Sequence, residues 1–158
     1  MSKIDAIKSW IGMTIGISSY IAWIPTVYFI LFGGTTIRTI IGIILIYQYF
    51  FATKSDLFRS FMGWLKPYNY FNSTNIIVEE ELRDNKCLFG FHPHGVGTMG
   101  FSFSSFLNET LNKTVLGASR VMTTLPISGL FSKLLGATGV NPKNFVSYMK
   151  KGKLIKIN

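Results

Sequence analysis

The first third of the chain contains two strongly apolar runs with basic residues at their flanks. No charged side chain occurs from Ser9 to Ile37, and apolar residues are densest from Trp10 to Phe32. At a rise of 1.5 Å per residue, about 23 helical residues reach about 34 Å, enough to cross a hydrocarbon core of about 30 Å. A second uncharged run, Thr39 to Thr53, has about 15 residues, fewer than the roughly 20 that a spanning helix needs.

A turn is expected between the two runs at Gly33-Gly34, because glycine can adopt a positive φ. Pro25 is expected to kink the first helix, since proline lacks a backbone N–H and its ring clashes with the preceding turn. Arg38, just beyond the turn, has a side chain long enough to reach a lipid headgroup. This pattern fits either two spanning helices or a re-entrant hairpin, and both place the two flanks on one side of a membrane.

Basic residues flank the hairpin on both sides: Lys3, Lys8, Lys54, Arg59 and Lys66. An excess of Lys and Arg in short flanks marks the cytosolic side, so we expect both ends of the hairpin in the cytosol. A cleaved signal peptide fits less well because the apolar run is too long. The sequons at Asn72, Asn108 and Asn112 would indicate a lumenal location only if they carried glycans.

The chain divides into three predicted segments. These are a membrane hairpin with a short cytosolic N-terminus over 1–54, an interfacial aromatic linker over 55–74, and a partial α/β domain over 75–158. The linker mixes aromatic residues with Arg59 and Lys66, which suits a segment at the headgroup level. It equally suits a connector that packs on the following domain.

From Asn75 onward, short apolar runs alternate with segments of helical spacing, which indicates an α/β fold. Strands are predicted at 76–78, 87–91, 114–118 and 153–157, and helices at 103–111, 126–136 and 141–149. Gly136 is suited to end the second of these helices, and Asn141-Pro142 to begin the third.

The sequence His92-Pro93-His94-Gly95 directly follows the predicted strand over 87–91. A polar, glycine-rich turn after a strand is where α/β proteins place working residues. Histidine exchanges protons near neutral pH, so the residues suit general acid–base catalysis or a hydrogen-bonded turn with no chemistry. No metal site is predicted, because the chain has only two histidines and no cysteine or carboxylate lies close to them in sequence.

Composition narrows the functional class. Hydrophobic residues make up 48% of the chain, which excludes a disordered protein. A net charge of +9 favours an anionic partner, and with a membrane hairpin and no nucleic-acid motif we expect a lipid membrane and no nucleic acid. The single cysteine, Cys87, excludes an intramolecular disulfide framework. Serine hydrolase chemistry is not indicated, since no Gly-x-Ser-x-Gly motif surrounds the serines after the histidines.

Following such a hairpin, the segment FGFHPHGVGTMG resembles the type-2 diacylglycerol acyltransferase family, which includes monoacylglycerol and wax-ester acyltransferases. The His-Pro-His-Gly tetrapeptide after an apolar strand is the signature of that family. The likeness continues through Gly117-Ala118-Ser119, the helix that begins near Pro126, and GATGVNPKNFVSYMKKGK at 136–153.

The resemblance implies a membrane-bound O-acyltransferase that moves a fatty acyl group from acyl-CoA to a hydroxyl of diacylglycerol or a related acylglycerol or alcohol. It implies a glycerolipid-acyltransferase-like α/β fold, the endoplasmic reticulum membrane with lipid droplets as a further location, and no cofactor beyond acyl-CoA as co-substrate. His92 or His94 would be the base, with Pro93 and Gly95 completing the motif. Position 97 is glycine where the related fold has an acid, so the carboxylate that orients the base is not identified.

Basic residues concentrate in the last third of the chain, where Arg120 and Lys143 are candidates for contact with the phosphates of acyl-CoA. For any single lysine or arginine, a solvated surface position is the simpler interpretation. Family members continue beyond the strand near Lys153 through a Pro-Gly-Gly-type loop, so we expect a C-terminally shortened member. The alternative function is a non-catalytic membrane-hairpin protein that binds lipid or a full-length acyltransferase. Either function is compatible with a homo-oligomer.

Overall fold

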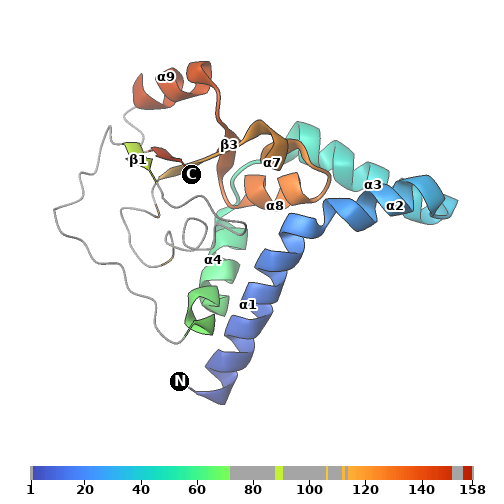
Figure 1. The fold of residues 1–158 in the computed structure, drawn as a ribbon, viewed down its shortest axis with the longest axis horizontal. Coiled ribbons are helices and arrows are strands. Elements are labelled where there is room, and N and C mark those ends of the chain that lie inside the picture. The colour runs from blue at the N-terminus through green and yellow to red at the C-terminus, as the bar shows by residue number, and fades with distance from the viewer. Residues whose placement is uncertain are drawn as a thin grey trace.

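The computed structural model describes residues 2–71, 88–90, 106, 112, 114–150 and 155–157. Among these residues, helices predominate over a small parallel sheet (Figure 1). The helices are α1 (Lys3–Ile21), α2 (Trp23–Phe32), α3 (Thr35–Ile46), the π-helix η1 (Tyr47–Phe51), α4 (Asp56–Leu65), the 3-10 helix η2 (Pro67–Tyr70), α7 (Arg120–Thr124), α8 (Ser128–Leu134) and α9 (Pro142–Lys150). The strands are β1 (Leu88–Gly90), β2 (Val115–Ala118), β3 (Ala137–Gly139) and β4 (Ile155–Ile157).

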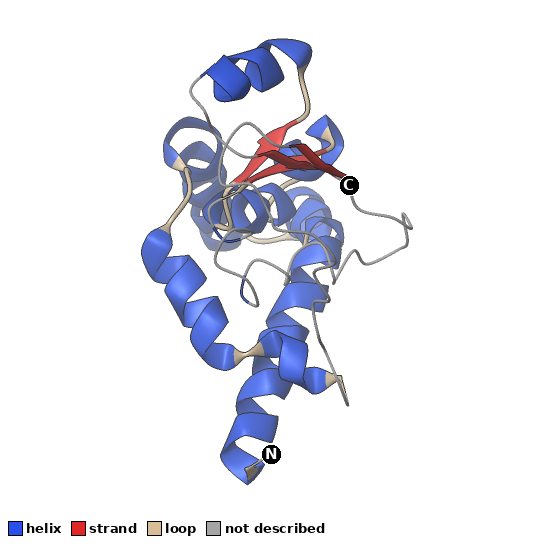
Figure 2. Ribbon diagram, turned by 90° about the vertical axis from the view of Figure 1, so that its left-hand side faces the viewer, coloured by secondary structure: helices blue, strands red, loops and turns tan. Residues whose placement is uncertain are grey.

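The sheet has the strand order β1-β4-β2-β3, and each described pair is parallel. In register, Leu88 of β1 and Val115 of β2 both lie opposite Ile155 of β4. The helix α9 lies on one side of the sheet and most of the other helices lie on the opposite side (Figure 2). The described residues from Leu88 onward therefore combine a small parallel sheet with helices, whereas the glycerolipid-acyltransferase-like fold stays a prediction.

The first apolar run is broken in the middle. The helices α1 and α2 meet at a bend of 55° on either side of Ala22. Pro25 explains the break, because a proline ring clashes with the carbonyl of the residue four positions earlier, here Ile21 at the end of α1. The predicted kink near Pro25 is confirmed, and the bend divides the first apolar run into two helices.

None of the helices among the described residues is by itself both long and apolar enough to cross a bilayer. Two pairs of consecutive segments, each bent at a short break, have the length and apolar composition needed when the two members are taken together. They are Lys3–Ile21 with Trp23–Phe32, and Thr35–Phe51 with Asp56–Tyr70.

The turn at Gly33-Gly34 is present between α2 and α3, but its glycines serve a different purpose from the one expected. Their φ values are −72° and −67°, so neither adopts the left-handed conformation. A Cβ atom on Gly33 would lie 2.4 Å from the carbonyl oxygen of Phe29, so the turn needs glycine for close backbone approach. Arg38 donates from its guanidinium to the carbonyl oxygen of Leu31 at 2.9 Å and so binds the end of α2.

The described core joins all three predicted segments. Its buried residues are Met13, Met62, Leu65, Leu116 and Leu135. Phe58 of α4 packs edge-on against Phe131 of α8, with ring centroids 5.4 Å apart. Burying one such apolar side chain contributes about 1.5–3 kcal/mol, so these contacts fix α1 and α4 to the sheet. The boundaries of the three predicted segments stay a prediction.

Most of the predicted elements that fall on described residues are confirmed: the strands at 87–91, 114–118 and 153–157, and the helices at 126–136 and 141–149. Gly136, with a φ of 93°, follows α8 as expected. The strand predicted at 76–78 and the helix predicted at 103–111 fall outside the described elements. The strand β3 and the helices α4 and α7 were not predicted.

Candidate functional site

The strand β1 precedes the predicted catalytic motif, with only Phe91 between Gly90 and His92 in the sequence. The motif His92-Pro93-His94-Gly95 itself lies outside the described residues. In a parallel sheet all carboxyl ends meet at one edge, which is where α/β proteins form their binding sites. The carboxyl end of β1 therefore belongs to the edge at which a site is expected.

The two basic candidates, Arg120 and Lys143, lie at the start of the helices that follow β2 and β3. The backbone N–H of Val140 donates to the carbonyl oxygen of Ala118 at 2.8 Å, which holds these two strand ends together. Both basic residues are exposed at this edge of the sheet, consistent with contact to an anion or with a solvated position. The described residues contain no group of three or more His, Cys, Asp or Glu side chains able to share a metal ion.

A buried amide connects the hairpin to the α/β body. Gln48 lies in the π-helix η1 and is 0% exposed. Its Nε2 donates to the carbonyl oxygen of Leu125 at 3.0 Å, and its Oε1 accepts from the backbone N–H of Ile127 at 2.8 Å. The backbone carbonyl oxygen of Gln48 accepts a hydrogen bond from Lys133 Nζ at 2.7 Å. The π-helix is a rare conformation that often marks functional sites, and here it turns this amide toward the body.

The segment that Gln48 binds is a strained turn. Ile127 has φ 61° and ψ −46°, and the N–H of Ser128 donates to the carbonyl oxygen of Pro126 at 2.7 Å. This is a γ-turn with a positive φ, which is rare for any residue and costly for a β-branched one. A conformation of this kind costs about 1–3 kcal/mol and persists only where surrounding contacts enforce it. The hydrogen bonds of Gln48 supply such contacts.

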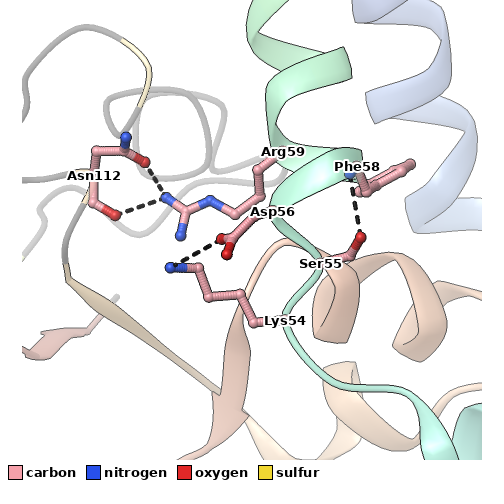
Figure 3. A network of polar contacts seen from close by, with 6 residues as sticks. All are labelled: Lys54, Ser55, Asp56, Phe58, Arg59 and Asn112. Atoms are coloured by element: carbon pink, nitrogen blue, oxygen red, sulfur yellow. Dashed lines mark hydrogen bonds and ion pairs between the residues drawn. The ribbon is translucent and has the colours of Figure 1, made fainter.

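A second polar contact joins α4 to Asn112 (Figure 3). The guanidinium of the buried Arg59 donates to both the backbone and the side-chain oxygen of Asn112. Burial lowers the pKa of Arg59, while the negative charge of Asp56 raises it. Of the sequon that begins at Asn112, Asn112 is exposed and Thr114 is buried.

A cavity of about 400 Å³ lies beside the strand β3. Its described lining residues come from the segment after the hairpin, from β2 and β3, and from the helices α7, α8 and α9: Ala52, Thr53, Lys54, Val115, Thr123, Lys133, Gly136, Ala137, Thr138, Gly139 and Tyr148. Two of these residues are lysines, and none is acidic. The cavity therefore favours a negatively charged ligand.

Several of these residues were not identified from the sequence. Gln48 had one usable signal, since it is an amide inside an otherwise apolar run. In the sequence, Lys54 is recognisable only as a flanking charge and Lys133 only as part of the basic C-terminal third. No local pattern shows that both reach one cavity, because their proximity depends on how α8 packs on the residues that follow η1.

No family model, curated protein or solved structure matches the chain. The likeness to the type-2 diacylglycerol acyltransferases depends on the residues quoted for it.

Proposed function

We propose that this chain is a membrane-bound O-acyltransferase that transfers a fatty acyl group from acyl-CoA to a hydroxyl of diacylglycerol or a related acylglycerol or alcohol. The observation that carries the proposal is the strand β1, which belongs to a parallel sheet and ends just before His92-Pro93-His94-Gly95. A strand of such a sheet leads its following residues toward the edge where ligands bind. A histidine pair after that strand suits proton transfer to and from a substrate.

Membrane association is supported by the surface of α2 and α3. Both helices expose large apolar side chains: Ile24, Val27, Tyr28, Phe29, Ile30, Leu31, Phe32, Ile37, Ile40, Ile43 and Ile46. In Figure 1 these helices project from the side of the body. A contiguous apolar surface of this extent marks contact with lipid or another protein. We assign it to the endoplasmic reticulum membrane, with both flanks in the cytosol and lipid droplets as a further location.

The proposed reaction is a direct acyl transfer. The imidazole of His92 or His94 removes the proton from the acceptor hydroxyl as its oxygen attacks the thioester carbonyl. The carbon–sulfur bond then breaks, and the CoA thiolate takes the proton from the imidazolium. Backbone N–H groups in the glycine-rich turn would stabilise the oxyanion, and the histidine contributes roughly a 10²–10⁴-fold rate increase.

A second candidate is a non-catalytic lipid-binding protein. The exposed hairpin favours it, because α2 and α3 bring the chain to a membrane without any contribution from the histidines. The core that joins α1 and α4 to the sheet gives the hairpin a folded base of its own. In this function the chain would bind lipid or a full-length acyltransferase without turnover.

The test is incorporation of radiolabelled acyl-CoA into neutral lipid by microsomes from a host that lacks triacylglycerol synthesis. Label in an acylglycerol or wax ester that falls about 100-fold or more in His92→Ala or His94→Ala is the expected result. Val121→Ala, at an exposed position of α7, is the matched control and should retain activity. Activity that survives both histidine changes would refute the proposed mechanism. No label from membrane-inserted protein would support the non-catalytic candidate.

A further inference from the structure

Two lysines from different parts of the fold line the cavity beside β3. Lys54 follows the hairpin, and Lys133 lies in the last turn of α8. The hydroxyl-bearing residues Thr53 and Tyr148 line the same cavity. Its volume of about 400 Å³ falls within the roughly 300–1,000 Å³ of small-molecule sites.

The backbone around Lys54 is held by the body of the protein. The N–H of Ser55 donates to the carbonyl oxygen of Leu134 at 3.1 Å. The Lys54 stem lies over Gly136, where a Cβ atom would be 3.3 Å from its Cγ. Gly136 also has a φ of 93°, so a side chain at that position would be strained as well as crowded. The stem of Lys54 is thereby directed along the cavity wall.

Lys133 is held by contacts with the π-helix η1. Its Nζ donates to the carbonyl oxygen of Gln48 at 2.7 Å and lies 5.6 Å from the ring centroid of Tyr49. An ammonium group has three donors, so this hydrogen bond does not exhaust it. Its position is therefore fixed while it can still bind a ligand.

The carboxylate of Asp56 competes only weakly with a ligand for the ammonium group of Lys54. Asp56 Oδ1 is 3.5 Å from Lys54 Nζ, but the side chain of Asp56 is 89% exposed and that of Lys54 is 49% exposed. An ion pair this exposed contributes little, and a ligand oxyanion inside the cavity can replace it. The strand β3 adds backbone to the wall, because in the described sheet it pairs on one side only, with β2.

We infer that this cavity binds a phosphate group between Lys54 and Lys133. A phosphate offers several oxygens to two cations and to hydroxyl groups, and lysine is a common phosphate ligand. The exposed aromatic residues Phe50 and Phe51 directly precede the lining residues 52–54, so the cavity begins where the lipid-facing hairpin ends. A glycerophospholipid headgroup fits this location, and the phosphates of CoA share the same chemistry. The inference does not depend on catalysis by the histidines.

The experiment measures binding calorimetrically to the full chain purified in detergent. The probes are dioctanoyl phosphatidic acid, CoA and inorganic phosphate, each measured separately. We expect Lys54→Gln to weaken binding about fivefold and Lys133→Gln about tenfold, and Asp56→Asn to strengthen it severalfold by removing the competing charge. Lys3→Gln, which removes the same charge from an exposed position at the start of α1, should bind as the parent does.

The outcomes separate the two sources of phosphate. Binding of phosphatidic acid that depends on both lysines identifies a lipid headgroup, and CoA binding with that dependence identifies a soluble ligand. Failure of all three probes to bind, or binding that Lys54→Gln and Asp56→Asn leave unchanged, overturns the inference. Because these two changes affect exposed side chains, they test it even if Lys133→Gln fails to fold. Repeating the titration with His92→Ala and His94→Ala combined distinguishes loss of this site from failure of the acyl-transfer proposal.

Discussion

The side-chain oxygen of Gln48 accepts the backbone N–H of Ile127 at 2.8 Å, across a separation of 79 residues in the chain. One partner lies in the π-helix that ends the hairpin, and the other is the strained residue of the turn before α8. The hydrogen bond therefore links the part of the chain proposed to contact lipid with the part that supports the sheet.

Replacing Gln48 with leucine should destabilise the protein by about 2–4 kcal/mol. The change removes two buried hydrogen bonds and leaves Leu125 O and Ile127 N–H without these partners. Tyr49→Phe is the matched control, since it removes one hydrogen bond to Thr124 O at an exposed position and should cost less than about 1 kcal/mol. Thermal unfolding in detergent measures both. Equal losses in the two variants would show that the buried amide has no special role.

Gly129→Ala should destabilise the same junction by about 2–3 kcal/mol, because a Cβ atom there would lie 2.5 Å from the carbonyl oxygen of Thr123 and 2.7 Å from Gln48 Nε2. Gly42→Ala in α3 provides the comparison, since a Cβ atom at Gly42 meets nothing within 4 Å. It should leave stability unchanged or raise it by up to about 1 kcal/mol. A mild effect of Gly129→Ala in denaturant titration would mean that the turn tolerates expansion.

Arg59 and Asn112 should behave as a coupled pair. Arg59→Ala removes both hydrogen bonds to Asn112 and should cost about 1.5–3 kcal/mol, whereas Asn112→Ala removes only the one to its side-chain oxygen and should cost less. The double variant should cost clearly less than the sum, because the hydrogen bond to the Asn112 side chain is lost in both single variants. A double-mutant cycle on unfolding free energies measures this coupling. Strict additivity would argue against the contact.

Charges placed on the hairpin should release the protein from membranes, whereas the same charge on the body should not. Phe32 and Ile43 are 71% and 62% exposed on α2 and α3, and Val121 of α7 is 63% exposed. A buried carboxylate in the hydrocarbon region costs roughly 2.5–3.5 kcal/mol, so Phe32→Asp combined with Ile43→Asp should shift the chain into the soluble fraction on carbonate extraction. Val121→Asp should remain in the pellet. If all variants partition alike, the hairpin is not the anchor.

Local patterns along the chain were enough to predict the boundaries of several elements. The proline rule located the break near Ala22, and the glycine and Asn-Pro signals located the ends of α8 and the start of α9. The strand β3 was missed because Ala137-Thr138-Gly139 is too short and too small to show an alternating pattern. It becomes a strand only because β2 lies beside it.

Some residues of the candidate site could likewise be predicted from local sequence, and others could not. His92 and His94 were proposed from a motif, and Arg120 and Lys143 from charge, all of which are local features of the sequence. The pairing of Lys54 with Lys133 and the binding of Ile127 by Gln48 depend on packing between segments far apart in the chain. The sequence near each of these residues does not indicate which distant residue lies beside it.

The strand order has a consequence for the sequence of events during synthesis. The strand β4, formed by Ile155–Ile157, lies between β1 and β2, and β1 has no other neighbour in the described sheet. The strand β1, which leads into the histidine motif, can therefore pair with β4 only after Ile155–Ile157 have left the ribosome. The hairpin is complete more than a hundred residues earlier, as the positions of Phe51 and Ile155 show. Membrane insertion of the proposed hairpin can thus precede closure of the sheet, so that the edge proposed to carry catalysis would be assembled on a chain already anchored at the bilayer.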